Sequence, residues 1–211
     1  GINNVAIGFK AGEDITTGDN NTAVGRVALT NITTGDNNVG IGQGSLESLT
    51  TASNNTGLGF ATLGNNTTGA NNTAIGANAL DANTTGGQNV AVGDDALGAN
   101  TTAPYNVAIG TNALAVNTTG NLNTAVGSFS LDANTVGDRN VAVGYQALTT
   151  FNPSSNADTY NVAVGGVALK NLTTGTLNTA VGGQAMELAT TGGSNTAMGY
   201  GALNANTTGA N

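Results

Sequence analysis

The chain has 211 residues, of which only 8% are charged, and it carries a net charge of −8 with no histidine and no cysteine. The absence of these two residue types excludes Ser-His and Cys-His nucleophiles, disulfide bonds and thiolate metal sites. The only cations, Lys10, Arg26, Arg139 and Lys170, are too few to form a basic surface for nucleic acid. No apolar run approaches the roughly 20 residues that a membrane-spanning helix needs.

A 17-residue repeat runs through the whole chain. Its consensus is N-V/T-A/G-V/I/L-G-x-x-A-L-x-x-N-T-T-G-x-x, and positions 1 to 17 are counted here from the first asparagine. Successive copies keep this spacing, except that the ninth copy is longer by four. The twelve copies begin at Asn4, Asn21, Asn38, Asn55, Asn72, Asn89, Asn106, Asn123, Asn140, Asn161, Asn178 and Asn195.

The first predicted element of each copy is a strand over positions 1 to 5, residues 4–8 in the first copy. Its residues alternate, so positions 2 and 4 share one face and position 3 lies on the other. Position 3 is always Ala or Gly, and position 4 is always aliphatic or Met. Glycine occupies position 5 in every copy, from Gly8 to Gly199, which indicates a positive φ or a close backbone approach.

The second half of each copy is predicted to hold a short extended segment around Ala-Leu and then a Thr-Thr-Gly turn. Two glycines per copy, together with Asn, Thr and Val, argue against helix. One copy then forms one coil, and coils stack through parallel strands about 4.8 Å apart, so that twelve coils would extend roughly 55 Å. The sequence therefore predicts an all-β fold, a parallel β-solenoid that forms a single repeat domain over residues 1–211.

Stacking places identical residues above one another in ladders. Asparagine side chains in such a ladder can hydrogen-bond along the stack and satisfy backbone groups at a corner. We expect no catalytic, cofactor or metal residues, and instead structural ladders at positions 1 and 5, represented by Asn4, Gly8, Asn21, Gly25, Asn72, Gly76, Asn195 and Gly199.

Ladders of small residues on one face of the strand and of bulky residues on the other also predict association between chains. A coil this small encloses little volume, so the bulky face of the strand requires a cover, and the simplest cover is another copy of the chain. We expect a homotrimer or another homo-oligomer. No polar capping element is recognisable at either end, so we also expect the solenoid to continue beyond residues 1 and 211, as part of a longer fibre or by end-to-end stacking into a filament.

The ninth copy carries the main irregularity, four extra residues within Thr149–Tyr160. A loop on a rigid scaffold can contact a partner, with Phe151, Asp158 and Tyr160 as candidate contact residues, or it can be a tolerated insertion. Single aromatic residues also recur at position 6, where they could contact sugars or neighbouring chains or have no role: Phe9, Phe60, Tyr145 and Tyr200.

The strand half of the repeat resembles a known family. The motif stands as N-N-V-A-I-G at Asn3–Gly8 and Y-N-V-A-I-G at Tyr105–Gly110, and it is similar to the head repeats of trimeric autotransporter adhesins. The longer form at Asn195–Gly209 resembles repeats of phage tail-fibre and bacterial surface-fibre proteins. The adhesin resemblance implies a left-handed parallel β-roll that trimerises side by side, although the 17-residue period is longer than that of adhesin heads.

Together these features lead to an expected function. We expect a non-catalytic segment of an extracellular structural fibre or adhesin, at a cell surface or on a virion, whose partners are copies of itself and a host surface or glycan. We expect no cofactor, no nucleic acid partner and no membrane insertion. The alternative is an ice- or glycan-binding solenoid, because threonine recurs at positions 13 and 14, although adjacent residues of an extended segment point to opposite faces.

Overall fold

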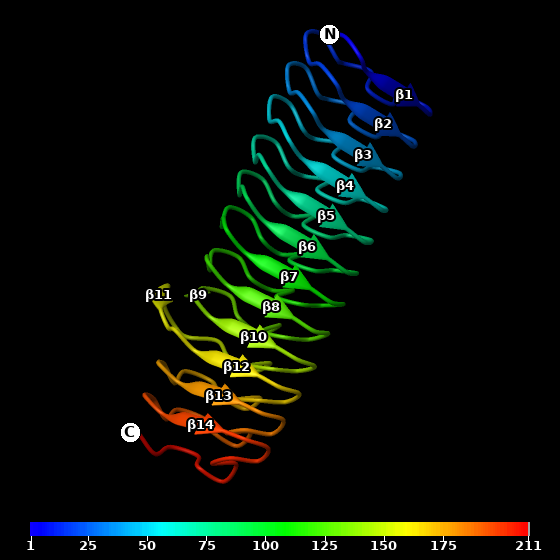
Figure 1. Cartoon of the computed structure of the whole chain (residues 1–211). Helices are drawn as coiled ribbons and strands as arrows, with labels where there is room; N and C mark the ends of the chain where they lie inside the picture. Colours follow the sequence, from blue (N-terminus) through cyan, green and yellow to red (C-terminus); the bar gives the residue numbers. More distant parts are fainter. Residues whose placement is uncertain (211) are drawn as a thin grey trace. The chain divides into compact units, whose positions relative to one another are not determined.

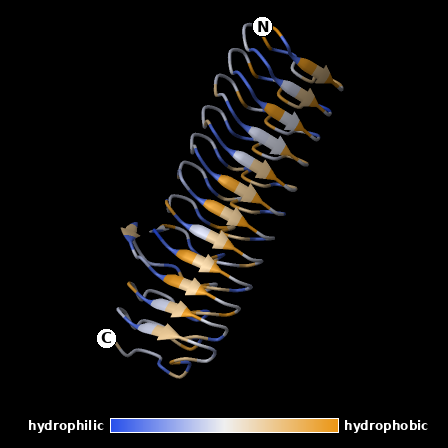
Figure 2. Cartoon of the chain, in the orientation of Figure 1, coloured by the Kyte–Doolittle hydropathy of each residue, from blue (hydrophilic) through white to orange (hydrophobic). Residues whose placement is uncertain are grey.

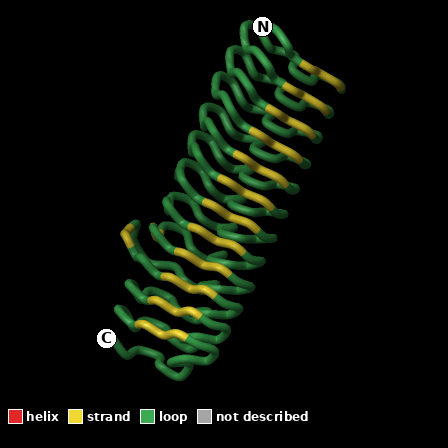
Figure 3. The backbone as a smooth tube through the Cα atoms, viewed as in Figure 1, coloured by secondary structure: helices red, strands yellow, loops and turns green. Residues whose placement is uncertain are grey.

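A computed structural model describes residues 1–210 of the chain. Its contacts divide the chain into two compact units, Gly1–Tyr105 and Asn106–Asn211. Each unit is built from short parallel strands joined by turns, and the described residues contain no helix (Figure 3). The prediction of an all-β parallel solenoid with coils of about 17 residues is confirmed.

The first unit contains six strands in sequence order, one from each coil (Figure 1). Each pairs with its neighbours in parallel and in register, so that Thr22 faces Val39 and Ala23 faces Gly40. The strands occupy positions 2 to 4 only, because the flanking asparagine and glycine form corners. Their bounds are β1 Val5–Ile7, β2 Thr22–Val24, β3 Val39–Ile41, β4 Thr56–Leu58, β5 Thr73–Ile75 and β6 Val90–Val92.

The second unit repeats this arrangement with six further strands and adds a small second sheet. The six are β7 Val107–Ile109, β8 Thr124–Val126, β10 Val141–Val143, β12 Val162–Val164, β13 Thr179–Val181 and β14 Thr196–Met198. The small sheet pairs β9 (Gly137–Asp138) with β11 (Ala157–Asp158) in parallel, and β11 belongs to the predicted insertion.

The interior of each coil is filled from positions 3, 8 and 9. Ala23, Ala28 and Leu29 of the second coil are fully buried, and the same positions are buried in most later coils. Position 3 is there Ala or Gly, position 8 is Ala, Ser or Thr, and position 9 is Leu or Met. Burying one leucine side chain contributes about 2–3 kcal/mol, an upper value because unfolded chains are partly compact. A thin apolar core is thus repeated in every coil.

The segment around Ala-Leu is not extended, which corrects the expectation of a second extended segment. Positions 7 and 9 have left-handed backbone conformations, with φ of 53° at Val27 and 49° at Leu29. This conformation is unfavourable for residues with a Cβ. Here it orients both N–H groups toward neighbouring coils: Val27 donates to the Phe9 carbonyl at 2.9 Å and Leu29 to the Ser45 carbonyl at 3.0 Å. Hydrogen bonds along the stack therefore offset the local cost.

The glycine at position 5 has both properties that the sequence indicated. Gly25 has φ of 134°, and a Cβ at this residue would lie 2.6 Å from the carbonyl oxygen of Gly42 in the next coil. Only glycine fits this corner without moving the backbone of the neighbouring coil.

Each coil presents three outer surfaces. The strand side carries the side chains of positions 2 and 4, and the turn side carries positions 6, 7, 10 and 11. The threonine side carries positions 13, 14, 16 and 17. Position 3 is buried while positions 2 and 4 are half-buried or exposed, as in Thr22–Val24 and Val39–Ile41, so the predicted alternation of the strand is confirmed.

Candidate functional site

Asparagine at position 1 forms a buried ladder in both units. The backbone N–H of Asn21 donates to Oδ1 of Asn4 at 2.8 Å, and Nδ2 of Asn21 donates to the carbonyl of Gly35 at 2.8 Å. Each side chain thus joins two successive coils and also closes the far corner of its own coil. A buried amide that lost these partners would cost about 1–3 kcal/mol.

The other sequence-predicted ladder residues take the same roles. The N–H of Asn72 donates to Oδ1 of Asn55 at 3.0 Å, and the N–H of Asn195 donates to Oδ1 of Asn178 at 3.1 Å. The glycines at position 5 all have positive φ: 131° at Gly8, 134° at Gly25, 126° at Gly76 and 116° at Gly199. These residues hold the coils together and leave the outer surfaces to other positions.

Threonine at position 13 forms a second ladder, at the surface. The hydroxyl of Thr33 donates to the carbonyl of Thr50 at 3.1 Å, and that of Thr67 donates to the carbonyl of Thr84 at 3.0 Å. The same bond occurs in the second unit between Thr173 and the carbonyl of Thr190. The hydroxyl hydrogens of this ladder are therefore engaged in stacking the coils.

The strand side carries a row of exposed aliphatic side chains. At position 4 of the first unit, Ile41 is 36% exposed, Leu58 44% and Ile75 37%. In Figure 2 the strands are orange where position 2 is valine and paler where it is threonine. Five intervals of about 4.8 Å between six strands give a ribbon roughly 25 Å long in that unit. Contiguous exposed apolar surface of this kind is typical of interaction sites.

The insertion in the second unit forms a polar cluster at the surface. Arg139 donates through Nε to Oδ1 of Asp158 at 2.7 Å, and its guanidinium lies 5.8 Å from the centre of the Tyr160 ring. The Tyr160 hydroxyl lies 3.2 Å from Oδ2 of Asp158. The hydrogen bond with Asp158 is the main cause that raises the pKa of Arg139 above its ordinary value. Asp158 and Tyr160 are exposed and remain candidate contact residues.

Phe151, the third candidate of the insertion, is fully buried, which corrects the expectation of a partner contact. It occupies position 12, which points into the coil. A Cβ at Gly137 of the preceding coil would lie 3.0 Å from Cε1 of Phe151, so the ring packs against that backbone. Phe151 therefore helps to anchor the insertion from inside.

The four aromatic residues of position 6 lie on the turn side and are exposed. Phe9 contacts the ammonium group of Lys10, which lies 6.0 Å from the ring centre. Tyr145 packs edge-on against Phe129 at a centroid distance of 6.4 Å. Phe60 lines a groove, which the sequence did not reveal because the groove results from small residues beside the ring.

The described residues show no grouping of acidic side chains that could hold a metal ion. Within residues 1–210, none of the structure has the helix length and apolarity needed to cross a bilayer. The ladders and the strand side instead define a β-solenoid repeat protein, built from coils of about 17 residues. Comparison with protein-family models, curated proteins and solved structures finds no match for this chain.

Proposed function

We propose that this chain is a non-catalytic segment of an extracellular structural fibre or adhesin that associates with further copies of itself through its strand side. The observation that carries the proposal is the row of exposed aliphatic residues at position 4 in consecutive coils of the first unit, Ile41, Leu58 and Ile75. A ladder of this kind is self-complementary along its length, so that copies of the same chain can bury it against one another. A trimer, as in adhesin heads, is the arrangement we expect.

The remaining surfaces support a structural role. The position 1 asparagines and the position 13 threonines use their side chains to join coils. Because the hydroxyls of position 13 donate to carbonyl groups of the next coil, this ladder is committed to stacking, which favours the fibre over an ice-binding surface built from position 13. An ice-recrystallisation assay separates the two, since the proposed fibre segment leaves ice growth unchanged.

Sedimentation equilibrium over a range of protein concentrations tests the self-association. The wild-type chain is expected to be a homo-oligomer, and replacement of Ile41, Leu58 and Ile75 by lysine is expected to give a monomer. The matched control places three lysines in the same coils at exposed position 14, by replacing Thr51, Thr68 and Thr85, and stays oligomeric.

A milder variant guards against unfolding by charge repulsion along the ladder. Replacement of Ile41, Leu58 and Ile75 by threonine keeps the strand propensity and removes most of the apolar surface. Circular dichroism establishes that each variant keeps its sheet content. A wild-type chain that is monomeric at all concentrations overturns the proposed association, as does an oligomer that both triple variants leave intact.

A further inference from the structure

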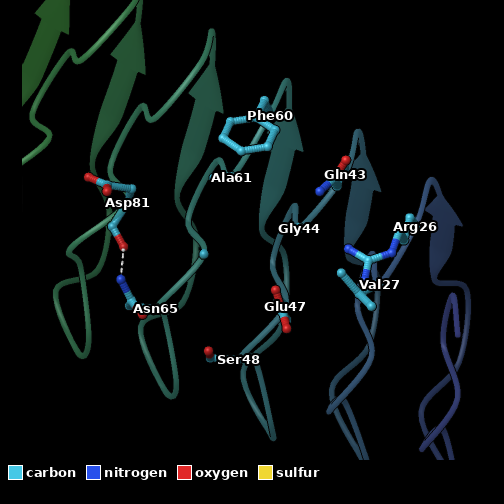
Figure 4. Close-up of a pocket in the computed structure, with 11 residues that line it drawn as sticks. Arg26, Val27, Gln43, Gly44, Glu47, Ser48, Phe60, Ala61, Asn65 and Asp81 are labelled. Atoms are coloured by element: carbon cyan, nitrogen blue, oxygen red, sulfur yellow. Dashed lines mark hydrogen bonds between the residues drawn. The ribbon is translucent and has the colours of Figure 1, made fainter.

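The turn side of the first unit contains a groove of about 410 Å³ that spans four consecutive coils. Its volume is within the usual range of small-ligand sites, about 300–1,000 Å³. Figure 4 shows its residues projecting from successive turn segments, with Arg26 at one end, Asp81 at the other and the Phe60 ring between them. The groove therefore runs along the direction in which the coils stack.

Two glycines create the groove by interrupting ladders of larger residues. Gly44 occupies position 7, where the neighbouring coils have Val27, Ala61 and Asn78. Gly64 occupies position 10, where the adjacent coils have Glu47 and Asp81. A Cβ at Gly44 would meet only the Glu47 carboxylate at 3.5 Å and Ala61 Cα at 3.8 Å, which are ordinary contacts. Space for a ligand thus exists where side chains are missing.

The lining combines one aromatic ring with many polar groups. Phe60 is 55% exposed, and the surrounding side chains of Arg26, Gln43, Glu47, Asn65 and Asp81 offer both hydrogen-bond donors and acceptors. Nδ2 of Asn65 donates to the backbone carbonyl of Asp81 at 2.8 Å, which fixes the orientation of that amide. Burial is the main cause that raises the pKa of Asp81 above its ordinary value, so this carboxyl group is partly withdrawn from water.

This combination limits the chemistry of the ligand. Two carboxylates against one guanidinium disfavour an anion such as a phosphate group. The many polar groups disfavour a purely apolar ligand, because their hydration would be lost without compensation. Sugar rings present hydroxyl groups that both donate and accept, together with C–H faces that pack on an aromatic ring. Three intervals of about 4.8 Å give a length of roughly 14 Å, which suits a linear chain of several sugar rings.

We propose that this groove binds a neutral linear oligosaccharide along the stacking direction of the coils, with one sugar ring packed on Phe60 and the hydroxyl groups bonded to Arg26, Gln43, Glu47 and Asp81. The site is independent of the self-association proposed above, because it lies on the turn side and not on the strand side. Either property can fail without affecting the other.

Nuclear magnetic resonance titration of the full chain tests the site. The probes are maltohexaose, cellohexaose and the hexamer of N-acetylglucosamine, each compared with its monosaccharide. At least one hexamer is expected to shift the backbone amide signals of Gly44, Phe60 and Gly64, and to bind more tightly than its monosaccharide. If none of the three hexamers shifts these signals at millimolar concentration, the proposal is wrong.

Two variants and a control locate the binding. Phe60→Ala removes the aromatic platform, and Gly44→Asn fills the groove with a residue that the same position already carries at Asn78, with φ of 53°. Each is expected to weaken binding about tenfold or more, a loss of about 1.4 kcal/mol. Phe9→Ala removes an equally placed aromatic outside the groove and is expected to leave the affinity unchanged. Equal affinity for wild type, Phe60→Ala and Gly44→Asn overturns the proposal.

Discussion

Two groups of coils in the first unit fill the same interior point, position 12, with side chains of opposite polarity. The first three coils place Ile15, Ile32 and Leu49 there, and Ile32 and Leu49 are fully buried. The next three place Asn66, Asn83 and Asn100 at the same point, and all three are also fully buried. The strands are alike in both groups, and position 9 is leucine in every coil of both groups except the first, which has Gly12. One backbone therefore accepts either an apolar or a polar interior at this point.

The polar version works because every amide has partners. Nδ2 of Asn83 donates to Oδ1 of Asn66 at 3.0 Å and to the carbonyl of Gly86 at 2.9 Å, and its own Oδ1 accepts from Asn100 at 2.9 Å. The apolar version depends on area removed from water and needs no such geometry. Leu49 and Asn66 adjoin where the two groups meet, so one neighbour of the other type is tolerated. We infer that a residue at position 12 destabilises the chain when the coils on both sides carry the other type.

The largest expected effect comes from placing one asparagine in the apolar group. Ile32→Asn loses the burial of an isoleucine side chain and buries an amide between Ile15 and Leu49, neither of which can hydrogen-bond to it. We expect a loss of about 4 kcal/mol in the free energy of unfolding. Urea denaturation followed by circular dichroism measures it. Ile32→Val is the control, with an expected loss of about 1 kcal/mol, and equal losses for both variants would contradict the inference.

The reverse substitution disrupts the hydrogen bonds between the asparagines of position 12. Asn83→Leu removes the donor that Oδ1 of Asn66 has in the next coil. It also removes one of the two acceptors of Nδ2 of Asn100, which keeps the carbonyl of Ala103 at 3.1 Å. We expect these losses to outweigh the gain in apolar burial. We expect a loss of about 2 kcal/mol, with faster amide hydrogen exchange in the coils on either side. Ile32→Leu introduces the same residue into the apolar group and is expected to cost less than about 1.5 kcal/mol. A stabilised Asn83→Leu chain would show that burial alone decides this position.

The parts of the fold that the sequence predicts are those in which one residue type serves one purpose in every coil. The strands, the face of position 3, the corner glycine and the asparagine ladder follow from such strict repetition. The turn side does not, because Val27 and Leu29 adopt a backbone conformation that their own preferences disfavour and that hydrogen bonds from neighbouring coils impose.

The candidate sites also differ in how far the sequence predicts them. Asp158 and Tyr160 are exposed, as a loop suggests, but Phe151 is buried. The register of the repeat places Phe151 at position 12, and the buried Ile32, Leu49 and Leu172 show that this position is interior. The groove beside Phe60 depends on two glycines that belong to different copies of the repeat and line the same groove once the coils stack.

The smallest expected effect concerns the carboxyl group of Asp132, which lacks the hydrogen bonds that the buried asparagines make. In the part of the chain that the structure describes, the buried Oδ1 of Asp132 has no hydrogen-bond partner, and burial raises the pKa of this carboxyl group above its ordinary value of 3.8. A carboxyl group with a raised pKa binds more protons in the folded than in the unfolded chain. Stability therefore falls as pH rises from about 3.8 through the folded-state pKa, and the ionised group remains a cost at neutral pH.

Asp132→Asn removes this charge and is expected to stabilise the chain at pH 7 by about 0.5 kcal/mol, a modest value because the side chain is only partly buried. The variant should also show a weaker fall in stability between pH 4 and neutral pH, measured as the urea midpoint at each pH. Asp36→Asn is a useful control, because Oδ1 of Asp36 accepts the N–H of Asp19 at 2.7 Å. Stabilisation of both variants to the same extent would point to net charge, whereas stabilisation of Asp132→Asn alone shows that the missing partner decides, as it does for the asparagines of position 12.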